Sequence, residues 1–183
     1  MTSKTTKRTS VSRRLSQTVL QDIRLFATDV DGVLTDAGMY YSESGDEWKK
    51  FNAHDGMGIK LLQKAGLITA IVTQERTRLV ARRAEKLAIP ELHQGAVDKL
   101  SVIRDMAERH GISLRQISYI GDDVNDMEAL NAVGFSAAPA DGLPQVRKIV
   151  DYVCRLKGGE GAVRELAEMI LLSRIKATTK RER

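Results

Sequence analysis

A short apolar run that ends in two closely spaced carboxylates constrains this chain more than any other feature. Residues 23–27 predict a buried β-strand, which is followed by Asp29, Asp31 and the strand-breaking Gly32. Side chains at positions i and i+2 of a strand project to the same side. Both carboxylates are therefore expected together at the carboxyl end of the strand, where open α/β sheets bind ligands.

Such a pair of carboxylates predicts a cation. Buried neighbouring carboxylates repel each other unless a cation or a shared proton relieves them, and Mg2+ with its oxygen ligands meets that need. An aspartate can also attack phosphorus and form an aspartyl-phosphate. For this stretch alone, an ordinary turn rich in Asp and Gly is the alternative.

Three later stretches add to this pattern in a fixed order. A second apolar strand over residues 68–73 ends in a hydroxyl, Lys99 opens a predicted helix, and a third strand over residues 116–120 leads into a carboxylate cluster. That cluster contains Asp122, Asp123 and Asp126. Strands and helices alternate along the chain, which predicts a mainly parallel sheet covered on both faces. We therefore predict a single doubly wound (Rossmann-like) α/β domain with a small β-hairpin insertion at residues 38–51.

The ordered set DxDG…T…K…GDDxND resembles the four motifs of the haloacid dehalogenase superfamily of phosphatases. The likeness covers about residues 22–172. Within that superfamily the chain is similar to small phosphatases that act on phosphorylated 3-deoxy-2-ulosonic acids and lack a large cap. The stretches that carry this likeness are residues 29–36, 52–59, 94–99 and 158–165. The resemblance implies a Mg2+-dependent phosphoric monoester hydrolase that acts through an aspartyl-phosphate on 3-deoxy-D-manno-octulosonate 8-phosphate or a close relative.

The resemblance also implies a role for each motif residue. Asp29 would be the nucleophile, Asp31 the general acid/base, and Lys99 the residue that neutralises phosphoryl charge. The metal ligands that it implies are Asp29, the backbone carbonyl of Asp31, and Asp122. Two further carboxylates, Asp123 and Asp126, would adjust the shell around the metal.

The phosphate-binding run departs from the family pattern. Thr73, Gln74 and Lys99 occupy the phosphate-binding positions, but family members commonly have Gly where this chain has Gln74. Phosphatases for 3-deoxy-D-manno-octulosonate 8-phosphate, the phosphate ester of an eight-carbon acid, commonly have Arg where this chain has Glu75. Many of them also have Arg where it has Glu160. The alternative is therefore a nine-carbon N-acylneuraminate or 2-keto-3-deoxy-nononate 9-phosphate phosphatase. The specificity residues that the resemblance implies are Glu75, Arg83, Lys86 and His54.

Two other classes of function compete with a phosphatase. A catalytically quiet scaffold related to these enzymes is disfavoured because all the motif residues are present. A phosphomutase is disfavoured because such enzymes usually carry a larger cap.

Two residues between the hairpin and the next predicted helix, His54 and Asp55, also have interpretations that involve no catalytic role. Asp55 is expected to cap a helix that we predict over residues 59–65. His54 is a candidate substrate contact, and a surface histidine at a helix entrance is its alternative.

The net charge of +5 comes from the two ends of the 183-residue chain. Residues 1–24 and 174–183 hold 11 of the 29 Lys and Arg and 2 of the 24 Asp and Glu, which leaves 18 basic and 22 acidic residues. The body therefore carries a charge of about −4. Aromatic residues make up only 4% of the chain, and no basic groove interleaved with them is visible, so no nucleic-acid partner is expected.

Composition divides the chain into three parts. Residues 1–21 predict a basic, disordered extension, residues 22–175 form the phosphatase domain, and residues 176–183 form a basic tail. The extension lacks the apolar core of a secretory signal, with an organellar presequence as the alternative. No apolar run is long enough to span a bilayer, so no membrane partner is expected. Cys154 is the only cysteine, so no intrachain disulfide can form and a cytoplasmic location is expected.

The hairpin predicted over residues 38–51 carries more apolar surface than a free hairpin shows. Met39, Tyr41 and Trp48 flank its turn at residues 44–46. An isolated two-stranded hairpin is marginal in water, so we expect it to pack against another subunit. In the family that the chain resembles, this hairpin helps to build a homotetramer in which a neighbouring subunit closes the active site, and the resemblance implies the same assembly.

Overall fold

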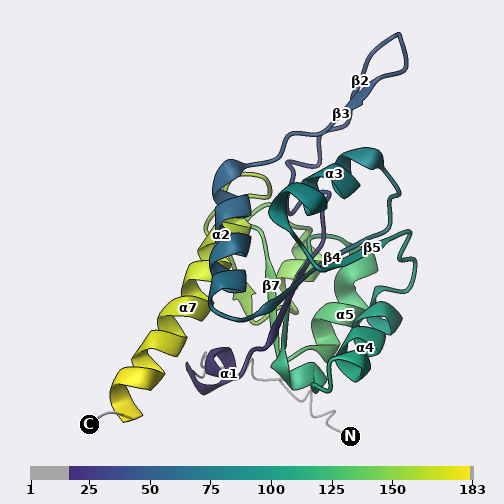
Figure 1. The fold of residues 1–183 in the computed structure, drawn as a ribbon. Helices are drawn as coiled ribbons and strands as arrows, with labels where there is room; N and C mark the ends of the chain where they lie inside the picture. The colour runs from purple at the N-terminus through teal and green to yellow at the C-terminus, as the bar shows by residue number, and fades with distance from the viewer. Residues whose placement is uncertain (1–16, 182–183) are drawn as a thin grey trace, which may run out of the picture.

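The computed structural model describes residues 17–181, and a six-stranded parallel sheet in the order β5-β4-β1-β6-β7-β8 forms its centre (Figure 1). The first strand, β1 (Leu25–Thr28), lies between β4 (Ile68–Thr73) and β6 (Ile117–Ile120). The chain adds β4 and β5 on one side of β1 and then crosses to β6 on the other side. Such a reversal of strand order is a topological switch point, where α/β proteins bind ligands. The predicted doubly wound α/β domain is confirmed.

The remaining strands are short, whereas the helices range from four residues in α6 to 20 in α7. The other strands are β2 (Tyr40–Tyr41), β3 (Glu47–Trp48), β5 (Glu91–Gln94), β7 (Phe135–Ala138) and β8 (Tyr152–Val153). The helices are α1 (Gln17–Gln21), α2 (Ala53–Lys64), α3 (Arg78–Leu87), α4 (Lys99–Arg109), α5 (Met127–Ala132), α6 (Pro144–Arg147) and α7 (Ala162–Arg181). Two 3₁₀ turns, η1 (Leu114–Gln116) and η2 (Val124–Asp126), precede β6 and α5.

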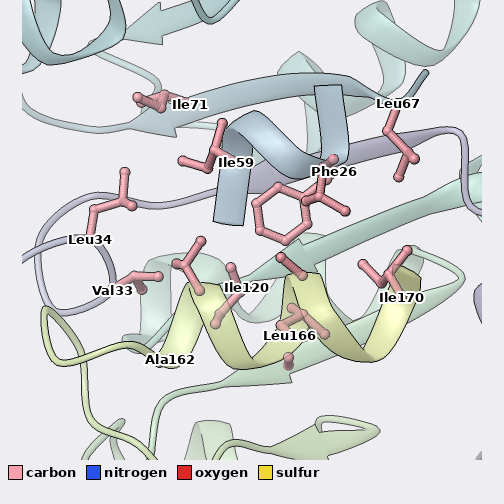
Figure 2. Close-up of a cluster of buried hydrophobic side chains, with 14 of the residues drawn as sticks. Phe26, Val33, Leu34, Ile59, Leu67, Ile71, Ile120, Ala162, Leu166 and Ile170 are labelled. Carbon is pink, nitrogen blue, oxygen red and sulfur yellow. The ribbon is translucent and has the colours of Figure 1, made fainter. Parts of the chain in front are cut away.

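Helices cover both faces of the sheet, and the sheet divides the hydrophobic core in two. Alternate residues of β1 point to opposite faces. Phe26 packs with Ile59 of α2 and Leu166 of α7 in one core (Figure 2). Leu25 packs with Ile103 of α4 in the other core. Because β1 is buried on both faces, its sequence is almost continuously apolar, as is typical of a central parallel strand.

The hairpin of β2 and β3 projects beyond the body of the domain (Figure 1). Its strands are antiparallel, with Tyr40 opposite Trp48, so the predicted hairpin is confirmed. At its base, Phe51 forms an antiparallel bridge with Thr35 of the segment after β1. The aromatic side chains of the hairpin remain open to solvent, with Tyr41 68% and Trp48 54% exposed.

The first large helix begins earlier than the sequence predicted. α2 starts at Ala53 rather than Ile59, and its N-cap is Asn52, whose side chain accepts a hydrogen bond from the His54 N–H at 2.8 Å. The expectation that Asp55 caps this helix is therefore wrong. Two glycines at positions 56 and 58 weaken the local helix signal, and packing against α7 (Figure 1) overrides it.

The ends of the described chain are helical. Residues 17–21, which the sequence placed in the extension, form α1, and Leu20 is buried. α7 continues to Arg181 through most of the predicted tail. Residues 1–16 and 182–183 lie outside the described residues, so the disorder of the extension stays a prediction. Within residues 17–181, no helix is both long and apolar enough to cross a membrane.

Candidate active site at the carboxyl edge of the sheet

Asp29 directly follows β1 and is firmly held. Its N–H donates to the carbonyl of Ile120 in β6 at 3.0 Å. One carboxylate oxygen accepts from the Val30 N–H at 2.7 Å, and the other lies 2.8 Å from Lys99 Nζ. Only 5% of Asp29 is exposed. The predicted nucleophile is therefore fixed at the carboxyl edge of the sheet, beside the switch point.

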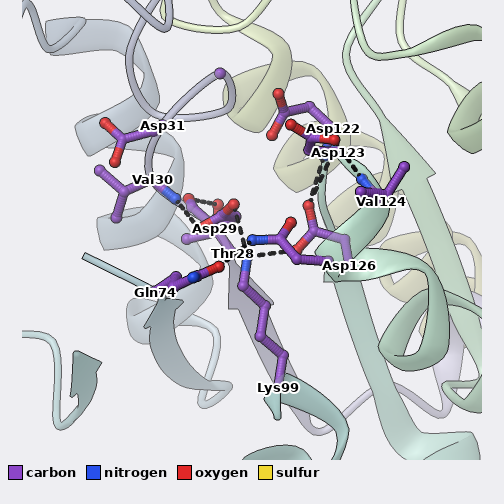
Figure 3. A network of polar contacts seen from close by, with 12 residues as sticks. Thr28, Asp29, Val30, Asp31, Gln74, Lys99, Asp122, Asp123, Val124 and Asp126 are labelled. Atoms are coloured by element: carbon purple, nitrogen blue, oxygen red, sulfur yellow. Dashed lines mark hydrogen bonds and ion pairs between the residues drawn. The ribbon is translucent and has the colours of Figure 1, made fainter. Parts of the chain in front are cut away.

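Asp31 does not project together with Asp29, contrary to the prediction. β1 ends at Thr28, before both residues, so the alternation of a strand does not govern their directions. Figure 3 shows the Asp31 side chain apart from the cluster of other carboxylates. Its Oδ1 accepts instead from Lys49 Nζ at 2.6 Å.

The carboxylates that follow β6 lie close to Asp29, which follows the neighbouring strand β1, and to Lys99 at the start of α4 (Figure 3). Asp126 Oδ1 accepts from Lys99 Nζ at 2.6 Å and from the Tyr119 hydroxyl at 2.5 Å. Asp126 Oδ2 accepts from the N–H groups of Asp122 and Asp123 at 2.9 and 3.1 Å. Both oxygens of Asp126 are thus engaged by donors of the protein. Asp126 therefore supports Lys99 and the loop that presents Asp122, and its role in the shell around a metal stays a prediction.

The cluster suits a divalent cation. Asp29, Asp122 and Asp126 each bring one oxygen to within 4.8 Å of the others. Burial and the charges of Asp29 and Asp126 raise the pKa of Asp122 to about 8. Burial and the charge of Asp126 raise the pKa of Asp29 to about 7, against the opposing effect of Lys99. Asp122 Oδ1 is buried and has no hydrogen-bond partner among the described residues. A hard cation such as Mg2+ relieves this repulsion and takes up the unpartnered oxygen, so the residues fit the predicted metal.

Two glycines let the loops around the cluster come close. Gly32 has a φ of +82°, and a Cβ at this position would lie 2.0 Å from Asp122 Oδ2. A Cβ on Gly158 would lie 1.9 Å from the carbonyl oxygen of Gly32. The glycine loop after β8 (residues 156–161) therefore packs directly on the turn that carries Asp31.

Thr73 and Gln74 lie where β4 ends, next to β1. Thr73 is buried at the end of the strand and does not cap α3. That cap is Thr77, whose hydroxyl accepts from the Val80 N–H at 3.2 Å. Gln74 Oε1 accepts from Asn125 Nδ2 at 3.0 Å. The residue that departs from the family pattern thus joins the loop after β4 to the loop after β6, a contact that Gly cannot make.

Two of the predicted specificity residues line a common cavity. Arg83 and Lys86 of α3 face a cavity of about 550 Å³ together with Phe51 at the base of the hairpin. The Arg83 guanidinium lies over the Phe51 ring at 5.4 Å and donates to the Asn52 carbonyl at 2.8 Å. Arg83 Nε is buried and has no partner within the described part of the chain. Arg82 adds a further positive charge to the lining and Glu85 a negative one. Its net positive charge suits an anionic ligand.

The other two predicted specificity residues lie outside this cavity lining. Glu75 pairs with Lys49 Nζ at 2.5 Å. His54 is exposed at the start of α2. The structure therefore does not gather the four residues into one cluster.

Lys49 and Asp55 have no role at the site that the sequence predicted. Lys49 belongs to no motif, and its two carboxylate partners lie elsewhere in the chain. Asp55 is buried, and its carboxylate accepts from the N–H groups of Gly161 and Arg164 at 3.2 and 2.9 Å. Burial raises the pKa of Asp55 in spite of these hydrogen bonds. It therefore holds the glycine loop and the start of α7 against α2.

The fold and this site define a class of enzyme. A parallel sheet presents a buried aspartate, a buried lysine and a carboxylate cluster at the carboxyl ends of its central strands. Residues 87–166 match the family model of the haloacid dehalogenase-like hydrolases. This match contains Lys99 and the cluster after β6.

Similar proteins narrow the class further. The chain is 40% identical over 153 residues to the 3-deoxy-D-manno-octulosonate 8-phosphate phosphatase KdsC of Escherichia coli K12, covering 84% of this chain and 81% of that protein. It is 41% identical over 155 residues to KdsC of Yersinia pestis, covering 85% and 83%. The crystal structure of the same phosphatase from Moraxella catarrhalis, in complex with a magnesium ion, a phosphate ion and a KDO molecule, shares 37% identity. The TM-score between the two structures is 0.85, and the match covers 91% of this chain and 97% of the Moraxella catarrhalis chain. The chain belongs to this family of 3-deoxy-D-manno-octulosonate 8-phosphate phosphatases within the haloacid dehalogenase-like hydrolases.

Proposed function

We propose that this protein is a Mg2+-dependent phosphatase that hydrolyses 3-deoxy-D-manno-octulosonate 8-phosphate through an aspartyl-phosphate intermediate. The observation that carries the proposal is the buried cluster of Asp29, Asp122 and Asp126 at the switch point of the sheet, in which the Lys99 ammonium contacts both Asp29 and Asp126. The names of the relatives and the ligands of the Moraxella catarrhalis structure support it.

The reaction divides into two transfers of the phosphoryl group. An oxygen of Asp29 attacks phosphorus, the bond from phosphorus to the sugar oxygen breaks, and Asp31 donates its proton to that oxygen. Water then attacks the phosphorus of the aspartyl-phosphate while Asp31 accepts a proton from the water. Inorganic phosphate leaves and Asp29 returns to its starting form. Lys99, Thr73 and the loop of Gln74 bind the phosphoryl oxygens and offset their charge in the transition state.

The proposed Mg2+ site uses residues on both sides of the switch point. Its ligands are Asp29, the backbone carbonyl of Asp31, and Asp122, supported by Asp123 and Asp126. When bound, the ion supplies positive charge that stabilises the phosphoryl oxygens in the transition state. The unpartnered, buried oxygen of Asp122 supports this assignment.

The eight-carbon acid is the substrate that the relatives favour, and a nine-carbon acid is the competing candidate because of Glu75 and Glu160. The structure weakens the argument that Glu75 selects a nine-carbon acid, because Lys49 already engages the Glu75 carboxylate. The cationic cavity beside Arg83 and Lys86 suits the carboxylate end of either acid.

The test is phosphate release with Mg2+ from the eight-carbon 8-phosphate and from the nine-carbon 9-phosphates. We expect preferred hydrolysis of the eight-carbon substrate, loss of activity when Mg2+ is chelated, and a more than ~10³-fold lower rate for Asp29→Asn, which removes the nucleophile. A preference for a nine-carbon acid would move the assignment to that substrate. No hydrolysis of any of these esters, or full activity of Asp29→Asn, would refute the phosphatase mechanism.

We also infer a homotetramer whose active sites are completed by a neighbouring subunit, and a cytoplasmic location. The exposed aromatic side chains of the hairpin support the assembly. The single cysteine, Cys154, is buried as a free thiol, which suits a reducing compartment.

A further inference from the structure

Lys49 joins three distant segments at the edge of the active site. It follows β3 at the base of the hairpin, and its Nζ lies 2.6 Å from Asp31 Oδ1 and 2.5 Å from Glu75 Oε2. The Lys49 side chain is 0% exposed, whereas those of Asp31 and Glu75 are 27% and 44% exposed. An ammonium that is removed from water and shared by two carboxylates is held in one place, unlike a surface lysine.

The backbone around this contact is anchored, but the Asp31 carboxylate is not. Phe51 ties the base of the hairpin to Thr35. The Thr35 hydroxyl accepts from the Gly32 N–H at 3.4 Å and so braces the turn that contains Asp31. Among the hydrogen bonds and ion pairs of residues 17–181, only Lys49 engages the Asp31 carboxylate. The orientation of this side chain therefore depends on Lys49.

We propose that Lys49 is a positioning residue for Asp31, and that Glu75 holds Lys49 in place. The inference rests on the proposed function, in which Asp31 exchanges protons with the reacting oxygens. A proton donor must lie within about 3 Å of the oxygen that it serves, and an unrestrained carboxylate populates several rotamers. Lys49 engages one oxygen of Asp31 and leaves the other for the reaction. Glu75 then acts on catalysis through Lys49 rather than by contact with the sugar acid.

The test compares leaving groups, because only a poor leaving group needs the proton of Asp31. A sugar alkoxide is a poor leaving group, whereas p-nitrophenolate leaves without a proton. Release of the sugar acid from 3-deoxy-D-manno-octulosonate 8-phosphate and of p-nitrophenolate from its phosphate ester is measured in the first turnover, with Mg2+ present. This readout isolates the step in which Asp29 is phosphorylated. Steady-state kcat and KM are measured alongside.

We expect Lys49→Met to lower the first-turnover rate on the sugar phosphate about 100-fold, with a loss at least tenfold smaller on the aryl phosphate and little change in KM. Lys49→Arg keeps the charge and recovers part of the rate. Glu75→Gln gives the same pattern with a loss of about tenfold. The matched control is Lys50→Met, because Lys50 is 56% exposed and pairs with Asp36 away from Asp31. This control stays within about twofold of the unmodified protein on both substrates.

Other outcomes overturn the inference. Equal losses on both substrates mean a general structural role for Lys49. A loss confined to KM means that Lys49 or Glu75 contacts the substrate instead. An unchanged rate on the sugar phosphate means that Asp31 needs no positioning by Lys49. In each of these cases the unmodified protein still hydrolyses both esters, so the phosphatase mechanism stands, whereas hydrolysis of neither ester refutes the proposed function itself.

Discussion

At the scale of single residues, the surroundings of a carboxylate decide its protonation, and opposite edges of the sheet show opposite effects. At the carboxyl edge, crowding raises the pKa of Asp29 and Asp122. At the amino edge, Glu91 opens β5 and accepts two hydrogen bonds from the Arg109 guanidinium, at 2.8 and 3.0 Å. These hydrogen bonds, together with those to His110 and His93, lower the pKa of Glu91 to about 2. The reactive edge thus tolerates unfavourable charge, whereas the opposite edge uses charge for stability.

Glu91 makes the stability of the domain depend on pH. A carboxylate whose pKa is lower in the folded chain stabilises the fold fully above its unfolded pKa, 4.5, and loses this contribution as the pH falls through about 2. We expect Glu91→Gln to lower the urea midpoint at pH 7, with a difference that shrinks between pH 4.5 and pH 3. The control is Glu108→Gln, an exposed residue of the same α4. A loss of equal size at pH 7 and pH 3 would contradict this account.

At the scale of elements, the turn after β1 and the loop between β8 and α7 contact each other backbone to backbone. The Gly159 N–H donates to the Val33 carbonyl at 2.9 Å, and the Gly158 N–H donates to Asp141 Oδ1 at 3.0 Å. The approach of Gly158 to Gly32 leaves no room for a side chain. The position of the Asp31 turn therefore depends on a loop more than 100 residues away in the chain.

This contact predicts that Gly158→Ala damages both stability and activity. The added Cβ would lie 1.9 Å from the Gly32 carbonyl oxygen, so the backbone of one loop must move. Overpacking of this kind costs about 1–3 kcal/mol of unfolding free energy, and we expect kcat/KM to fall at least ~10-fold because the Asp31 turn is displaced. Urea unfolding and phosphate release measure the two effects. In the control Gly142→Ala, the nearest atom is 3.3 Å away, and equal behaviour of the two variants would show that the contact is unimportant.

The elements that surround the site were predictable because local signals set them. The strand predicted over residues 68–73 is β4 with the same bounds, and the carboxylates of Asp29 and Asp122 meet because parallel strands bring their carboxyl ends to one edge. Asp55 and Lys49 were not predictable in this way. Asp55 has its partner Gly161 at a separation of 106 residues, and Lys49 has Glu75 at 26. No local pattern marks a lysine or an aspartate for such a contact, so only the tertiary structure shows it.

At the scale of the whole molecule, the hairpin has two ends with different environments. Its strands project from the body (Figure 1) and expose Tyr40, Tyr41 and Trp48. Its base carries Lys49, whose side chain is 0% exposed and contacts Asp31. A two-stranded hairpin is marginal alone in water, so a neighbouring subunit that covers the exposed strands would also stabilise the segment that carries Lys49. A tetramer of this kind would link assembly and catalysis through one element.

This link predicts that a charge on the exposed hairpin separates the subunits and lowers activity. We expect the unmodified protein to have four times the mass of one chain by light scattering, and Trp48→Glu to give a smaller species, because a carboxylate buried in an apolar interface costs several kcal/mol. Phosphate release by the variant should fall at least ~10-fold, and should fall further on dilution as the remaining contacts dissociate. Leu172→Glu is the matched control, because Leu172 is 56% exposed on α7, far from the hairpin in the chain. An unmodified protein that is monomeric and fully active, or a tetramer that Trp48→Glu leaves intact, would show that the exposed strands serve no assembly and that Lys49 acts within a single subunit.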